Sequence, residues 1–82
     1  MSEQRKAPRR RTLLSGNIVF NQRGSVISCV VRNLSDTGAC IELPSPAGIP
    51  DTFELTIDPG NRVENCRVAW RSEKRIGVRF RL

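Results

Sequence analysis

Hydrophobic residues recur at every second position almost throughout this 82-residue chain, and this period limits what the chain can fold into. Alternation places successive side chains on opposite faces of a strand, so it predicts half-buried β-strands. No stretch has the three- and four-residue spacing of a helix that could cover a sheet face. The sheet must therefore close on itself to hide its apolar side, and we predict a small antiparallel β-barrel.

Six segments have the strand pattern. The last two are joined by the short polar connection Ser72-Glu73-Lys74, which predicts an antiparallel hairpin. The turn residues Asp58-Pro59-Gly60-Asn61 end another strand and predict a second hairpin. Three prolines in residues 44–50 exclude regular pairing there. We expect an all-β, six-stranded barrel over residues 12–82 with no substantial C-terminal helix, and strands at 14–20, 26–32, 39–43, 53–57, 66–71 and 76–81.

Positive charge is concentrated at the N-terminus. Fourteen Lys and Arg against eight Asp and Glu give a net charge of +6, and residues 1–11 hold five of the bases with one acid. Twelve of the bases are arginine, whose planar fork of donors suits phosphate and the edge of guanine. We therefore expect residues 1–11 to form a flexible arm, and an anionic partner with planar hydrogen-bonding groups.

Composition also disfavours several classes of function. The chain has no histidine, which excludes a His-based nucleophilic pair and a His-ligated metal site, and we expect neither an enzyme nor a cofactor. Cys29, Cys40 and Cys66 share no metal-ligand spacing and lie in apolar runs, so we expect reduced core thiols. The N-terminus lacks a signal sequence and no apolar run approaches 18 residues, which predicts a cytoplasmic protein without membrane insertion.

Two short motifs carry the functional signal. Arg5 and Arg9 form an R-x-x-x-R, a spacing that about 1.7 arginine pairs would show by chance in this composition. Asn33, Ser35 and Gly38 form an N-x-S-x-x-G between two strands, with a chance expectation of about 0.05. Taken singly, the first is typical of a solvated tail and the second of a turn with a side-chain hydrogen bond. Their combination favours a ligand site.

The order and spacing of these motifs, within a six-strand pattern, resemble the PilZ domain, a bacterial receptor for the second messenger cyclic di-GMP. The resemblance extends to Arg67-Val68-Ala69-Trp70 and Ile76-Gly77-Val78-Arg79-Phe80, which look like the closing hairpin of that family. It implies a signal-transduction role in which a downstream protein reads the bound state. The family often adds a C-terminal helix, whereas this chain ends at Leu82.

The resemblance also implies roles for the motif residues. Arg5 and Arg9 would hold guanine edges and phosphates from the arm, Asn33 and Ser35 would bond the ligand on the barrel wall, and Gly38 would admit a close approach. From its position we add Arg10 as a further candidate for phosphate contact. Trp70 is in phase with Cys66 and Val68, so we expect core packing rather than base stacking.

Two other functions remain open. A small basic barrel can bind RNA or DNA, although Phe53 and Phe80 fall on the apolar phase and leave no aromatic platform for stacked bases. A PilZ-like module that binds only protein is the third hypothesis. The intact motifs argue against it, and we expect cyclic di-GMP rather than nucleic acid as the partner.

Overall fold

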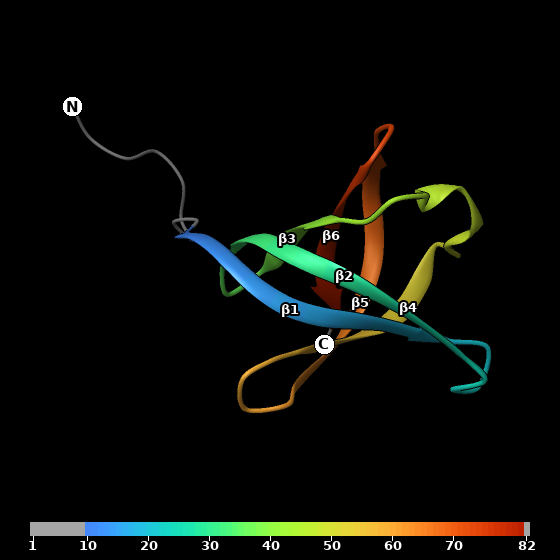
Figure 1. The fold of residues 1–82 in the computed structure, drawn as a ribbon, viewed down its shortest axis with the longest axis horizontal. Coiled ribbons are helices and arrows are strands. Elements are labelled where there is room, and N and C mark those ends of the chain that lie inside the picture. Colours follow the sequence, from blue (N-terminus) through green and yellow to red (C-terminus); the bar gives the residue numbers. More distant parts are fainter. Residues whose placement is uncertain (1–9, 82) are drawn as a thin grey trace.

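The computed structural model describes residues 10–81, and the six strands in it form one closed antiparallel barrel (Figure 1). The barrel closes because β1 pairs with both β2 and β4, so the order around it is β1-β2-β3-β6-β5-β4. The strands are β1 (Arg10–Phe20), β2 (Ser25–Leu34), β3 (Gly38–Glu42), β4 (Thr52–Ile57), β5 (Arg62–Arg71) and β6 (Arg75–Arg81). This confirms the predicted fold class.

Several strands are longer than the sequence pattern predicts. β1 begins at Arg10 rather than at Leu14, so it includes two residues that we expected in the arm. β5 begins at Arg62 rather than at Cys66. Most of the added residues are polar or basic, and the two apolar ones, Leu13 and Val63, are exposed, so none of them belongs to the buried face that the sequence pattern follows. Pairing with a neighbouring strand extends both strands beyond that pattern.

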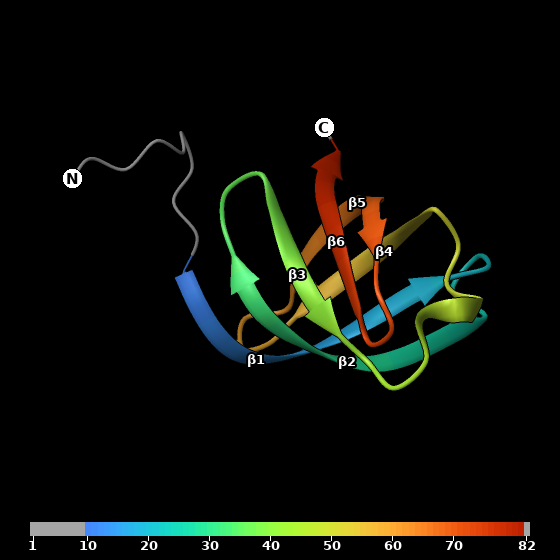
Figure 2. The same ribbon diagram turned by 90° about the horizontal axis from the view of Figure 1, so that it is seen from above.

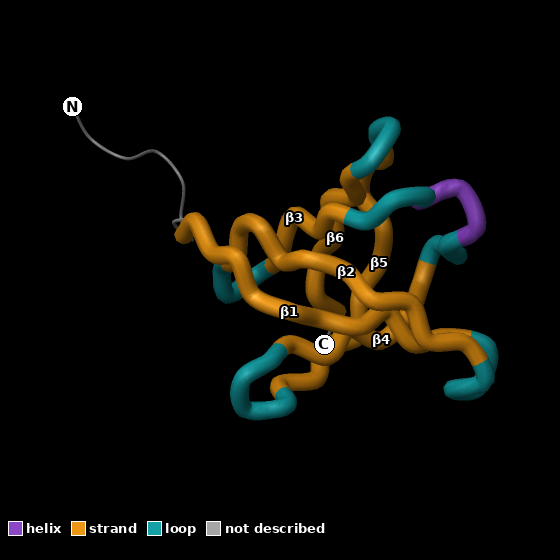
Figure 3. Tube along the Cα trace, viewed as in Figure 1, coloured by secondary structure: helices purple, strands orange, loops and turns teal. Residues whose placement is uncertain are grey.

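The hairpins follow the turn residues that predicted them. β4 pairs with β5 and β5 with β6, both antiparallel, and β1 with β2 forms a long hairpin along one side of the molecule (Figure 1). The connection from β3 to β4 crosses over: β3 pairs with β2 and β6, the chain continues into the proline loop, and β4 then pairs with β1 and β5 (Figure 2). Within residues 10–81 the only helical element is the 3₁₀ turn η1 (Pro46–Gly48) in that loop (Figure 3).

The core is aliphatic and lies inside the barrel. Its fully buried members come from every strand, which is what closure requires, because each strand must contribute its apolar face. Ile18, Val31, Ile41, Leu55, Cys66 and Ile76 have 0% of their surface exposed. Phe53 packs among them, and the partly buried Phe20 and Phe80 pack against the cluster.

The three cysteines are buried and free, as expected, but they occupy two different environments. Cys29 and Cys66 lie in the core cluster, and burial raises the pKa of each thiol to about 12. Near Cys66, the Glu64 carboxylate adds to this effect. Cys40 is 5% exposed but lies outside the core cluster, on the opposite face of β3 from Ile41.

We expect the free energy of unfolding to fall as the pH rises from about 9 toward 12. A thiol of ordinary pKa 9.0 ionises in the unfolded chain while Cys29 and Cys66 stay protonated in the folded barrel. The unfolded state therefore binds fewer protons in this range, which favours it. Chemical denaturation at a series of pH values measures the effect. The chain has no tyrosine and only two lysines, so few other side chains titrate there.

The matched variant is Cys29→Ala with Cys66→Ala. It should be less stable at pH 8, because it opens cavities in the core, but its stability should depend less on pH above 9. A slope as steep as that of the wild type would show that the buried thiols do not cause the alkaline loss.

Candidate functional site

The N-x-S-x-x-G motif lies on the hairpin between β2 and β3. Asn33 is within strand β2, where it pairs with Arg11 of β1 and Cys40 of β3, rather than in the turn itself. The same register brings Arg10 opposite Leu34. The start of β1, and with it the point where the N-terminal residues join the barrel, is therefore beside the motif.

Ser35 holds the turn together. Its hydroxyl oxygen accepts hydrogen bonds from the backbone N–H groups of Thr37 and Gly38, both at 3.2 Å, and lies 3.3 Å from the Gly38 carbonyl oxygen, to which it can donate. The Ser35 backbone N–H also donates to that carbonyl at 2.9 Å. These bonds fix the direction in which the hairpin turns, so a ligand at Ser35 would share a hydroxyl that already has a structural role.

Gly38 is required by the packing of two strands. A Cβ atom at this position would lie 2.3 Å from the backbone carbonyl oxygen of Val78 on β6. The neighbouring backbone cannot move away without breaking the β3–β6 pairing, in which Gly38 is opposite Arg79. The packing of β3 against β6 therefore explains why this position is glycine, without reference to a ligand.

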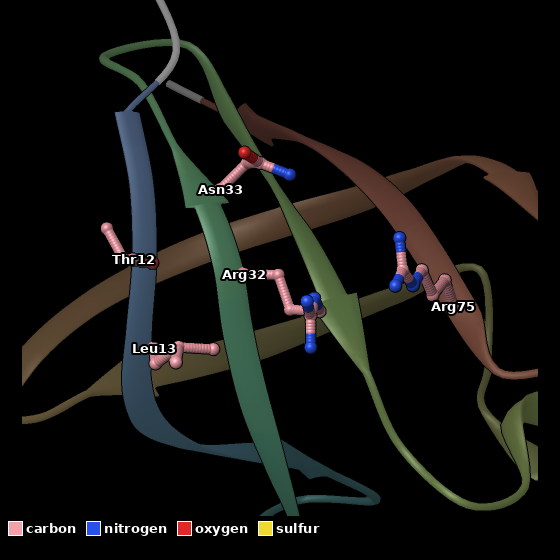
Figure 4. A pocket seen from close by; sticks show the side chains of 5 residues that line it. All are labelled: Thr12, Leu13, Arg32, Asn33 and Arg75. Atoms are coloured by element: carbon pink, nitrogen blue, oxygen red, sulfur yellow. The ribbon is translucent and has the colours of Figure 1, made fainter.

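A surface pocket of about 530 Å³ adjoins the motif (Figure 4). It is lined by Thr12 and Leu13 from β1, Arg32 and Asn33 from β2, and Arg75 from β6. Each of the first two pairs consists of consecutive residues, which a regular strand would place on opposite faces. The pocket has both members of each pair because the strands are bulged there.

The two bulges are adjacent. β1 gains a residue between Arg11 and Leu14 relative to β2, and β2 gains Arg32 relative to β3. The Thr12 hydroxyl donates to the Val31 carbonyl oxygen and fastens the first bulge to the neighbouring strand. A bulge interrupts the alternation of side chains along a strand, and here both residues of each pair reach the same pocket on the surface of the barrel.

The pocket is electropositive and contains one acid at its edge. Arg32 Nη1 lies 3.0 Å from Glu42 Oε1, and Arg75 Nε lies 3.7 Å from the same oxygen. In Figure 4 the two arginine side chains approach β3, the strand that carries Glu42, from either side. Two cations and one carboxylate give this cluster a formal charge of +1. Neither arginine was singled out from the sequence as a site residue.

Trp70 is exposed, which corrects the sequence-based expectation of core packing. β5 gains a residue between Val68 and Trp70 relative to β6, so Trp70 pairs with Gly77 and faces outward, 43% exposed. The indole covers Gly77 closely: a Cβ atom there would lie 2.1 Å from Trp70 Nε1. The alternation of side chains reverses at this bulge, which the sequence pattern does not show, so the sequence-based prediction placed Trp70 on the wrong face of β5.

The register places Trp70 and Asn33 in one row across the outer wall. Asn33 pairs with Cys40, Cys40 with Gly77, and Gly77 with Trp70. The row crosses β2, β3, β6 and β5 and contains a polar amide at one end and an aromatic surface at the other. Such a surface can stack on a planar base.

Arg71, the last residue of β5, contacts the proline loop. It donates to the Pro46 carbonyl oxygen at 3.2 Å and pairs with Asp51 at 3.1 Å. It therefore fastens the proline loop to the end of β5. A closed barrel leaves no edge strand that would need protection.

Arg5 and Arg9 lie outside the described residues, so their predicted roles stay predictions. The backbone of Arg10 is part of β1. Within residues 10–81 no group of three or more Cys, Asp or Glu side chains could hold a metal ion, and no helix is long and apolar enough to cross a membrane.

A comparison with family models identifies the fold. The model of the PilZ domain matches residues 3–82, nearly the whole chain. The chain belongs to the PilZ family. PilZ domains are non-catalytic receptor modules and typically bind cyclic di-GMP. A search of curated proteins finds no match to this chain.

Within this PilZ domain we expect Gly38→Ala to lower the free energy of unfolding by about 1–3 kcal/mol, the usual cost of overpacking. The physical reason is the contact between the added methyl group and the Val78 carbonyl. Gly48→Ala is the matched control, since no atom lies within 4 Å of a Cβ there. Chemical denaturation of both variants without ligand checks the prediction, and equal stabilities would contradict it.

Proposed function

We propose that this PilZ domain is a receptor for cyclic di-GMP, which it binds between its N-terminal residues and the outer wall of the barrel. The observation that carries the proposal is the register at the start of β1, where Arg10 is opposite Leu34 and Arg11 opposite Asn33. The described part of β1 therefore begins beside the second motif, one residue after Arg9 in the sequence. The residues proposed to bind the ligand are Arg5, Arg9, Asn33, Ser35 and Gly38, with Arg10 as a further candidate.

Chain geometry allows the two motifs to meet. Arg9 immediately precedes the first residue of β1, and Arg5 is four residues closer to the N-terminus. An extended chain spans at most about 3.6 Å per residue, so Arg5 has a reach of about 18 Å from Arg10. Asn33 and Ser35 are next to the strand partner of that anchor, within this reach.

The ligand matches the chemistry of the motifs. Cyclic di-GMP has two phosphates and two guanines, and each guanine presents O6 and N7 as neighbouring acceptors that an arginine fork can bond together. Asn33 can donate to or accept from a base or phosphate at the pocket. The pocket volume of about 530 Å³ is within the usual range for small-molecule sites.

The free energies are compatible with a clamp, in which the N-terminal residues 1–11 close over the bound ligand. Ordering about five residues costs roughly 5–10 kcal/mol of backbone entropy. Several charge-assisted hydrogen bonds at about 1.5–3 kcal/mol each, together with base contacts, offset this and leave a net binding free energy near −8 kcal/mol, or about micromolar affinity.

Isothermal titration tests the receptor directly. We expect the wild type to bind cyclic di-GMP with roughly micromolar affinity and Arg9→Ala to bind at least about tenfold more weakly, since it loses a bidentate contact. Arg23→Ala is the matched control, because Arg23 is an exposed arginine in the β1–β2 turn, at the other end of the hairpin from Asn33. The emission of Trp70, the only tryptophan, provides a second readout on the outer wall.

GTP and cyclic di-AMP are the ligand controls. A wild-type affinity for cyclic di-GMP no better than for these two nucleotides would reject the receptor and favour the protein-interaction module. An equal loss of affinity in Arg9→Ala and Arg23→Ala would show that net charge, rather than the motif, drives binding.

The proposed signal is closure of the N-terminal residues over the ligand, which changes the shape and charge that a protein partner meets. We expect amide hydrogen exchange of residues 1–11 to slow on saturation with cyclic di-GMP, whereas the β1–β2 turn should not change. Exchange that is the same with and without ligand would leave the receptor standing but reject the clamp.

Nucleic-acid binding is the second candidate, favoured only by the charge of +6. Of the four aromatic residues, Phe53 is buried and Phe20 and Phe80 pack against the core, which leaves Trp70 as a single exposed ring. One ring is a small platform for a strand of stacked bases. Binding of oligonucleotides with steep salt dependence, and without competition by cyclic di-GMP, would favour this candidate.

A further inference from the structure

Two arginines from different strands converge on one carboxylate beside the pocket. Arg32 of β2 and Arg75 of β6 are not neighbours in the barrel, because β3 runs between them. Both reach over β3 to the same oxygen of Glu42, at 3.0 and 3.7 Å. Both also line the pocket that contains Asn33 (Figure 4).

This cluster is not explained by stability. The side chains are 39% exposed for Arg32, 46% for Arg75 and 35% for Glu42, and ion pairs so open to water contribute little to folding. One carboxylate also cannot satisfy two guanidinium groups, each of which has five N–H donors. The cluster therefore retains positive charge and unused donors at the opening of a pocket.

We propose that Arg32 and Arg75 form an anion subsite for a phosphate group and that Glu42 occupies it in the ligand-free barrel. The carboxylate oxygen takes the place of a phosphate oxygen between the two forks. A phosphate group that enters displaces Glu42 and offers more acceptor oxygens to the same donors. This inference rests on the proposed function only for the source of the phosphate, which would be one of the two phosphates of cyclic di-GMP.

Glu42 then competes with the phosphate group for the two arginines, so removal of its charge should raise the affinity for the ligand. Glu42→Gln keeps the shape of the side chain but removes the negative charge, so the formal charge of the cluster rises from +1 to +2. We expect this variant to bind cyclic di-GMP about three- to tenfold more tightly, as expected when an opposing charge at a partly exposed site is removed. Arg32→Ala and Arg75→Ala should each weaken binding about tenfold or more.

The matched control is the pair Arg62–Glu64 on β5, which is joined at 2.7 Å, is also partly exposed and does not line the pocket. Arg62→Ala and Glu64→Gln change the net charge of the domain by the same amounts as the test variants. We expect both controls to bind within about twofold of the wild type, since distant surface charges are screened. Circular dichroism of every variant confirms that the barrel is folded.

A second probe separates the subsite from the ligand. Titration of the full chain with inorganic pyrophosphate, followed by NMR of the arginine Nε–Hε groups, should shift the signals of Arg32 and Arg75 and leave that of Arg62 in place. If cyclic di-GMP fails to bind but pyrophosphate shifts these signals, the proposed function is wrong and the subsite is supported.

Three results would overturn the subsite. Glu42→Gln could weaken binding, which would show that the carboxylate positions the arginines rather than competing for them. Cyclic di-GMP could bind equally well to the wild type, Arg32→Ala and Arg75→Ala, which would leave the receptor standing without this contact. The third result would be that neither cyclic di-GMP nor pyrophosphate shifts the Nε–Hε signals of Arg32 and Arg75, which would show that these residues do not bind anions.

Discussion

Closure of the barrel is the constraint on which the other features of this protein depend. No helix covers the sheet in the described residues, so every strand must turn one face inward, and the inward positions are filled by aliphatic residues. The polar residues that could meet a ligand are left on the outside. A regular strand offers only every second residue to that outer face, and this spacing is too sparse for a compact site.

β-Bulges overcome this spacing. At the adjacent bulges of β1 and β2, Thr12 with Leu13, and Arg32 with Asn33, reach one surface pocket, which these four residues line together with Arg75. The bulge of β5 turns Trp70 outward, at the other end of the row of paired residues that begins at Asn33. The pairing around each bulge still continues, so the core on the other side of the wall is not interrupted.

The sequence predicted the parts of the structure that follow from period and turn chemistry. Alternation of apolar residues is enough to predict six strands and their closure, and Asp58-Pro59-Gly60-Asn61 marks its hairpin without ambiguity. Bulges are not visible in this way, because one extra residue reverses the phase of everything after it. Trp70 was assigned to the core for this reason.

The cluster of Arg32, Glu42 and Arg75 was hidden for a different reason. Its members are separated by ten and by thirty-three residues, and they meet only because β3 lies between β2 and β6. The spacing of these residues in the sequence does not indicate that their side chains lie close together. The motif residues Asn33, Ser35 and Gly38 could be recognised because they are local, and yet the structure shows that two of them, Ser35 and Gly38, also maintain the hairpin.

A carboxylate between two arginines also affects which anions the proposed site can accept. With Glu42 in place, an incoming anion must replace an existing partner, so a single charge gains little over the ligand-free state. A ligand with a phosphate and a planar base gains more, because it can bond the two forks while its base reaches Asn33 or the exposed ring of Trp70 in the same row. In a domain with a net charge of +6, an internal competitor of this kind disfavours indiscriminate polyanion binding at the pocket and favours a ligand that makes several contacts at once.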